Sequence, residues 1–137
     1  MRVGTPKEIK NHEYRVGLTP ESVRELVAHG HEVWVETQAG SGIGASDADY
    51  VAAGGVIQPD AATLFGACDM IVKVKEPQAS ERAMLRAGQI LFTYLHLAPD
   101  PAQTKDLLKS GATCIAYETV TDDRGGLPLL APMSEVA

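Results

Sequence analysis

Short apolar runs alternate along the chain with longer segments in which apolar residues recur every three or four positions. Runs rich in β-branched residues are typical of buried strands, and the longer pattern is typical of helices with one buried face. The apolar runs predict strands over residues 2–5, 31–36, 55–57, 69–74, 89–94 and 112–116. Strands that alternate with helices indicate βαβ units and a parallel sheet.

Residues that start and stop helices support this alternation. The clearest helix is predicted to begin after the N-cap Thr19 and to end at Gly30, with Val23, Leu26 and Val27 on its buried face. N-cap residues predict three further helices, which follow Ser46, Asp60 and Asp100. The sequence therefore predicts an α/β fold, a Rossmann-like open parallel sheet with flanking helices.

The pattern changes after Tyr117. The sequence Asp122-Asp123-Arg124-Gly125-Gly126 is a turn signal between short apolar stretches. It predicts a hairpin or extended segment, a short β excursion near residues 117–131. Ser134-Glu135-Val136-Ala137 is typical of the first turn of a helix. Because nothing would cover that helix, we expect the chain to be part of a longer polypeptide.

Composition bounds the class of protein. The chain has 137 residues, of which 45% are hydrophobic, enough for the core of one domain. A net charge of -6 gives no basic surface for nucleic acid, and no apolar run reaches the length of a membrane span. Cys68 and Cys114 lie beside or within apolar runs, so we expect buried free thiols in a reducing, cytoplasmic setting. The start of the chain carries no signal-peptide pattern.

Two predicted strands run into a titratable side chain that is followed closely by a proline. Lys75 follows the run at residues 70–72, and His96 follows the run at residues 90–94. Ligands of open α/β sheets gather outside the carboxyl ends of the strands. Arg15 lies in the loop after the first strand, so we expect all three side chains at one edge of the sheet.

These residue types suit a small carboxylic acid. The guanidinium of Arg15 can bind a carboxylate through two hydrogen bonds, and Lys75 would add a point charge. His96 can exchange a proton near neutral pH. Two nearby cations disfavour a charged imidazole, and a neutral histidine is the base that oxidation of an alcohol or amine needs.

Each of these residues also has a purely structural interpretation. A lysine after a strand is usually solvated, and Lys73 is predicted to be such a residue. Arg15 could form a surface ion pair with Glu8 or Glu13, and a lone histidine is more often hydrogen-bonded than catalytic. The other histidines show no metal-ligand spacing and are predicted to have no functional role: His12, His29 and His31.

The segment Gly40-Ser41-Gly42-Ile43-Gly44 resembles a dinucleotide-binding fingerprint only superficially. A true fingerprint needs a third glycine three residues after the second, in the turn that opens the helix. Position 45 is alanine here, and Ser46 is the predicted N-cap. We therefore expect a flexible or close-packed loop.

An ordered set of motifs resembles the alanine dehydrogenase family. These motifs are Met1–Pro20, Gly40–Gly44, Ile71–Pro77, Phe92–Pro99, Ala116–Val120 and Leu130–Val136. The resemblance covers all 137 residues and corresponds to the amino-terminal, substrate-binding domain of the enzyme. In that family an NAD-binding Rossmann domain and a carboxyl-terminal return follow, and this sequence contains neither.

The resemblance implies reversible oxidative deamination of L-alanine to pyruvate and ammonia, with NAD as cofactor and no metal. Carried over by position, the implied roles are substrate binding for Arg15 and Lys75, acid/base catalysis for His96, a cofactor contact for Ser134, and supporting positions for Tyr94 and Glu118. It also suggests a homo-hexamer and a catalytic aspartate in the NAD domain. The chain alone is expected to be inactive.

Three alternatives stay open. The amino-terminal domain of the NAD-binding component of proton-translocating transhydrogenase is similar, but it differs where Lys75 and His96 stand. Saccharopine dehydrogenase is a more distant relative in fold. A non-catalytic domain could use the same cations, together with Arg15, only to sense a carboxylate.

Overall fold

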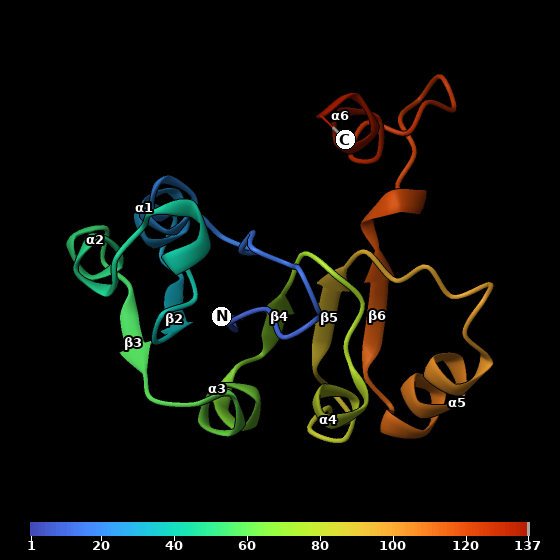
Figure 1. The fold of residues 1–137 in the computed structure, drawn as a ribbon, viewed down its shortest axis with the longest axis horizontal. Coiled ribbons are helices and arrows are strands. Elements are labelled where there is room, and N and C mark those ends of the chain that lie inside the picture. Colours follow the sequence, from blue (N-terminus) through green and yellow to red (C-terminus); the bar gives the residue numbers. More distant parts are fainter. Residues whose placement is uncertain (137) are drawn as a thin grey trace.

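Six parallel strands form one open sheet, and helices cover both of its faces (Figure 1). The computed structural model describes residues 1–136. The strands are β1 (Arg2–Thr5), β2 (Glu32–Glu36), β3 (Val56–Gln58), β4 (Met70–Val72), β5 (Ile90–Thr93) and β6 (Thr113–Ala116). Their order is β3-β2-β1-β4-β5-β6, and all neighbours pair in parallel. The predicted α/β fold with an open parallel sheet is confirmed.

The helices follow the strands in the predicted alternation. They are α1 (Pro20–Ala28), α2 (Asp47–Ala52), α3 (Ala61–Ala67), α4 (Ala79–Arg82), α5 (Pro101–Ser110) and α6 (Ala131–Val136), with 3₁₀ helices η1 (Ser41–Ile43) and η2 (Tyr117–Thr119). The predicted N-caps are confirmed, since Thr19 accepts from Ser22 N and Asp60 accepts from Thr63 N at 2.7 Å. The single turn α4 was not predicted.

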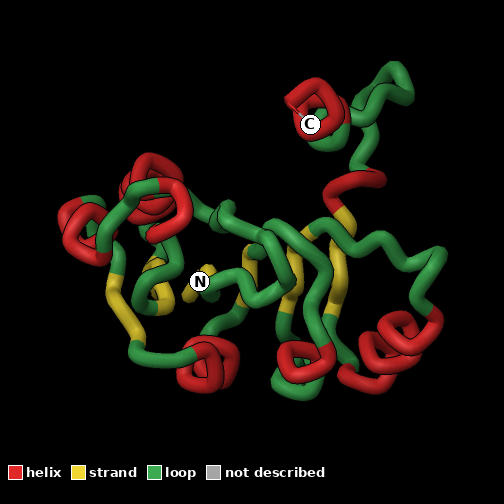
Figure 2. Tube along the Cα trace, in the orientation of Figure 1, coloured by secondary structure: helices red, strands yellow, loops and turns green. Residues whose placement is uncertain are grey.

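Alternate residues of β2 face two separate apolar layers. Val33 and Val35 pack with Val23 of α1 and Tyr50 of α2, whereas Trp34 packs against the opposite layer. That second layer contains Leu64, Phe65, Cys68, Ile71, Leu85, Leu91, Leu95 and Leu107. Helices therefore lie on both sides of the strands, as Figure 2 shows.

The β excursion predicted near residues 117–131 is wrong. Residues 117–119 form η2, and no strand occurs between there and the end of the described chain. The turn itself does form, because Asp122 N donates to Gly126 O at 3.0 Å. A hairpin also needs two strands that hydrogen-bond to each other, and the flanking segments form no such ladder. The helix predicted at Ser134 is part of α6, while Ala137 lies outside the described residues.

Both cysteines are free thiols. Cys68 is fully buried, as predicted, and burial raises its pKa to about 11. Cys114 is only half-buried, because it lies on β6 at the edge of the sheet. Across residues 1–136, none of the helices combines the length and the hydropathy that crossing a bilayer requires.

The inner strand β5, which lies between β4 and β6, should carry much of the stability of the domain. Leu91 is fully buried in the apolar core, so Leu91→Ala removes packing contacts and leaves a cavity. We expect a loss of about 2–5 kcal/mol in the free energy of unfolding, measured by urea denaturation. The control Leu108→Ala truncates a side chain that is 79% exposed and should change it by less than about 0.5 kcal/mol. Equal losses in the two variants would contradict the assignment of the core.

Candidate active site

The site lies at the carboxyl ends of β1, β4, β5 and β6, which are consecutive in the sheet (Figure 1). The strand order reverses between β1 and β4, and ligands of open α/β sheets bind at such a reversal. The loop after β1 carries Arg15, the segment after β4 carries Lys75, and the segment after β5 carries His96. The expectation that all three emerge at one edge is confirmed.

Beneath this edge lies a buried ion cluster that contains Lys73. Its ammonium is 3.0 Å from Glu8 Oε2 and 3.1 Å from Glu81 Oε2, and the three side chains are 1–2% exposed. Burial raises the pKa of Glu81, although Lys73 acts in the opposite direction. The prediction that Lys73 is a solvated sheet end is wrong, because the loop after β1 and helix α4 cover the end of β4.

Glu8 also fixes the backbone from which Lys75 projects. Its carboxylate accepts hydrogen bonds from Val74 N at 3.3 Å and from Lys75 N at 3.1 Å. The half-buried side chain of Lys75 places its Nζ 4.9 Å from the centre of the Tyr94 ring. An ammonium over an aromatic face is attracted by the ring quadrupole, so this contact orients the lysine.

His96 stacks on the same tyrosine. The ring centroids of Tyr94 and His96 are 5.5 Å apart with an interplanar angle of 15°, and Tyr94 Oη lies 3.1 Å from His96 Nδ1. The backbone of His96 has φ +48°, which is strained for a residue with a side chain. Glu118 supports that conformation, because its carboxylate accepts from His96 N at 2.7 Å and from Leu95 N at 3.1 Å.

Arg15 is exposed and pairs with Glu13. Its Nε and Nη2 donate to the two carboxylate oxygens at 2.9 and 2.6 Å, so the surface ion pair considered from the sequence does form. The hydrogen bond from Arg15 is the main reason why the pKa of Glu13 is lowered, and the charge of Lys75 adds to the effect. Arg15 and Lys75 therefore act on the same carboxylate.

A cavity of about 320 Å³ lies between α6 and the strand ends. Its lining includes Arg15, Val74, Tyr117 and Met133. The Tyr117 hydroxyl donates to Val74 O at 2.6 Å, and burial raises the pKa of this tyrosine to about 12. Ser134 is exposed on α6 and is not among the residues that line this cavity.

The glycine segment 40–44 is a close-packed loop, which confirms one of the two forms expected. A Cβ on Gly42 would lie 2.1 Å from Tyr14 O, and one on Gly40 would lie 2.6 Å from the Tyr50 ring. The segment contains η1 and packs against the backbone next to Arg15. It therefore shapes the loop that carries the guanidinium.

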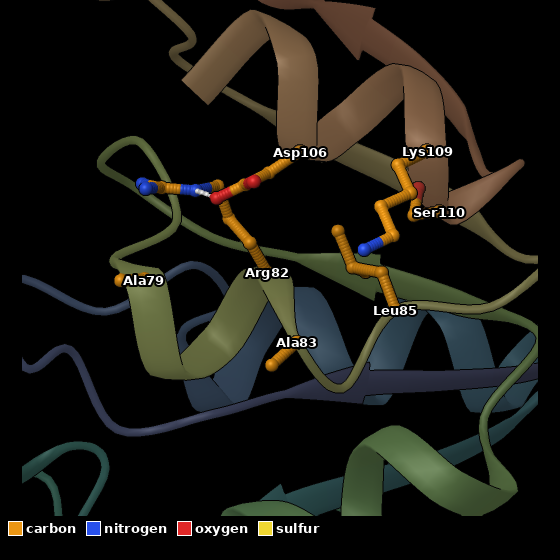
Figure 3. Close-up of a pocket in the computed structure, with 7 residues that line it drawn as sticks. All are labelled: Ala79, Arg82, Ala83, Leu85, Asp106, Lys109 and Ser110. Atoms are coloured by element: carbon orange, nitrogen blue, oxygen red, sulfur yellow. Dashed lines mark hydrogen bonds and ion pairs between the residues drawn. The ribbon is translucent and has the colours of Figure 1, made fainter. Parts of the chain in front are cut away.

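A second cavity lies away from this edge, between α4 and α5 (Figure 3). Its volume is about 430 Å³, and its lining includes Arg82, Asp106 and Lys109. Arg82 Nε donates to Asp106 at 2.8 Å, so its charge is already matched. Within residues 1–136 no group of three or more metal-ligating side chains comes together.

The sequence did not point to Glu8 or Glu81, and Tyr94 and Glu118 entered only through the resemblance. One signal was available for the buried cluster. Lys73 stands between two valines in an apolar run, at a position where a charge is unusual unless it is paired.

Fold and site together define an α/β domain that carries Arg15, Lys75 and His96 at the carboxyl edge of a parallel sheet. The family described as alanine dehydrogenase/PNT, N-terminal domain, matches residues 4–137. The chain belongs to this family.

Individual relatives agree with this assignment. The chain is 63% identical over its full length to the alanine dehydrogenase of Halomonas elongata and 55% identical to that of Mycobacterium tuberculosis. It spans 37% of the length of each of these relatives.

Solved structures also agree. A structure of an L-alanine dehydrogenase superposes with a TM-score of 0.96 at 52% identity, over all of this chain and 38% of that one. A transhydrogenase from Sinorhizobium meliloti superposes with a TM-score of 0.83 at 29% identity, over 90% of this chain and 37% of that one. The resemblance stated from the motifs is confirmed.

The packing of Gly42 against the loop of Arg15 can be tested by substitution. Gly42→Ala forces the Tyr14 carbonyl to move, so we expect a loss of about 1–3 kcal/mol in the free energy of unfolding. Gly66→Ala is the matched control, since a Cβ there meets nothing within 4 Å on α3. It should raise the stability by about 0.5–1 kcal/mol. Both values come from urea denaturation, and a neutral Gly42→Ala would show that the loop is not close-packed.

Proposed function

We propose that this chain is the substrate-binding domain of an NAD-dependent L-alanine dehydrogenase, which interconverts L-alanine with pyruvate and ammonia. The observation that carries the proposal is the continuous contact from Lys75 through Tyr94 to His96 at the carboxyl edge of the sheet. Arg15 lies at the same edge and is electrostatically linked to Lys75 through Glu13. The family membership supports the choice of substrate.

Arg15 and Lys75 would bind the substrate carboxylate and the neighbouring oxygen. Arg15 already engages a carboxylate with two nitrogens in the bond to Glu13, which is the geometry a bound acid needs. The ammonium of Lys75 would stabilise negative charge that develops on the carbonyl or carbinolamine oxygen. Substrate binding then requires Glu13 to share or release the guanidinium.

His96 would transfer the proton between the carbinolamine oxygen and the leaving nitrogen. Tyr94 holds the Nδ1 side of the imidazole, which leaves Nε2 for the substrate. A tyrosine hydroxyl can both donate and accept a hydrogen bond. It can therefore support both forms of the ring as the proton is taken up and given back.

The glycine loop lacks the third glycine of a dinucleotide-binding fingerprint, because position 45 is alanine. The exposed Ser134 is the one cofactor contact that the resemblance implies. We infer that a further NAD-binding domain supplies the hydride chemistry and that Ser134 contacts it. By the same resemblance, the complete enzyme is proposed to be a cytoplasmic homo-hexamer.

The shared fold also supports the alternative that this chain is a domain of a transhydrogenase. Titration with pyruvate and an assay of alanine-dependent NAD reduction by the complete polypeptide separate the possibilities. We expect pyruvate binding and turnover, whereas the 137-residue chain alone should not reduce NAD. Binding without turnover in the complete polypeptide would favour a carboxylate sensor. A complete polypeptide that does not bind pyruvate would favour the transhydrogenase.

The roles of Lys75 and His96 predict large kinetic effects. In the complete enzyme, Lys75→Ala and His96→Ala should each lower turnover about 10²- to 10⁴-fold, because each removes a positioned charge or a proton-transfer group. Steady-state oxidation of alanine measures both effects. The control Lys109→Ala changes a lysine at the cavity away from this edge and should keep wild-type turnover. Wild-type turnover in His96→Ala would remove its role in proton transfer.

A further inference from the structure

Two carboxylates hold the backbone at the positions from which Lys75 and His96 project. Glu8 accepts from Lys75 N at 3.1 Å and from the preceding amide at 3.3 Å. Glu118 accepts from His96 N at 2.7 Å and from the preceding amide at 3.1 Å. The same arrangement thus occurs after two neighbouring strands, and we call Glu8 and Glu118 the carboxylate clamps.

Each clamp is itself held in place. Glu8 is fixed by the buried ammonium of Lys73 at 3.0 Å. Glu118 lies in η2, beside Tyr117, whose hydroxyl donates to the carbonyl of Val74, two residues after β4 ends. The two clamps therefore connect the loop after β1 and the segment after β6 to the two strand ends between them.

The backbone at His96 needs such support. Its φ of +48° lies in the left-handed region, where a residue with a side chain stays only if its surroundings hold it. Glu118 provides the shortest hydrogen bond to this segment. A charged acceptor binds backbone amides more strongly than a neutral one does.

We propose that Glu8 and Glu118 are positioning residues, which set the placement of Lys75 and His96 relative to each other without touching the substrate. The inference rests on the proposed function. Glu118 affects turnover because it positions His96. Glu8 affects substrate binding because it positions Lys75.

The first test is a mutant cycle in the complete enzyme. Glu118→Gln keeps the size of the side chain but offers one acceptor oxygen, so we expect kcat to fall about 10- to 100-fold with little change in the KM for alanine. The same substitution in a His96→Ala background should cause no further loss, because its effect passes through His96. If the two losses multiply instead, the positioning role of Glu118 is overturned.

A parallel cycle tests Glu8. Glu8→Gln leaves Lys73 paired with Glu81 but removes one of the acceptor oxygens, so we expect the KM for pyruvate to rise about tenfold. In a Lys75→Ala background the rise should vanish. A rise that persists there overturns the role of Glu8. If Glu8→Gln does not fold, the cycle of Glu118 decides the proposal alone.

The matched control is Asp69→Asn. Asp69 Oδ2 also accepts a backbone amide, that of Arg2 at 2.7 Å, but at the amino ends of the strands. The substitution Asp69→Asn should leave kcat and KM unchanged. A loss of kcat as large as that of Glu118→Gln would overturn the proposal. Wild-type activity in the single variant His96→Ala would refute the proposed proton transfer. An impaired His96→Ala in which Glu118→Gln causes a further loss would refute only the clamps.

Discussion

The buried ammonium of Lys73 between Glu8 and Glu81 is the interaction on which the functional edge depends. Removing a charge from water costs several kcal/mol, and only close partners offset that penalty. Here the partners come from the loop after β1 and from α4, so one ion cluster joins three segments that are distant in sequence. Two carboxylates and one ammonium leave a net negative charge, which burial disfavours. The raised pKa of Glu81 has the same origin, since burial outweighs the charge of Lys73.

The arrangement of charges at the exposed edge follows from this buried ion cluster. The Glu8 carboxylate accepts hydrogen bonds from the Lys73 ammonium and from the backbone amide of Lys75. The side chain of Lys75 lies over the Tyr94 ring instead. Glu13, which carries a lowered pKa, balances Arg15 and Lys75. Cations that act on one carboxylate repel each other less when that anion is present. Under the proposed function, a substrate carboxylate would take the place of Glu13 beside Arg15.

Local signals in the sequence predicted most of the fold, and contacts between distant segments account for what they missed. Capping by Thr19 and Asp60 involves neighbours three residues away, which a sequence shows directly. The burial of Lys73 depends on a glutamate 65 residues away, and no local pattern reports such a partner. The turn at 122–126 forms as its glycines indicate, yet a hairpin also requires strands that pair, and they do not. For the site, the prediction of parallel strands placed Arg15, Lys75 and His96 at one edge, whereas the clamps required atomic contacts.

Topology explains where the site is, and side chains decide what it does. The strand order reverses between β1 and β4, so the loops after these strands diverge and open a crevice at that point. The transhydrogenase of Sinorhizobium meliloti has the same fold in this region, so a crevice at this position does not select a reaction. Under the proposed function, the selection comes from groups on the rim that would bind a carboxylate and move a proton. Tyr94 is central to that combination, because both the Lys75 ammonium and the His96 imidazole contact its ring. A fold that supplied the crevice without this shared ring would hold an anion but would lack a proton carrier aligned with it.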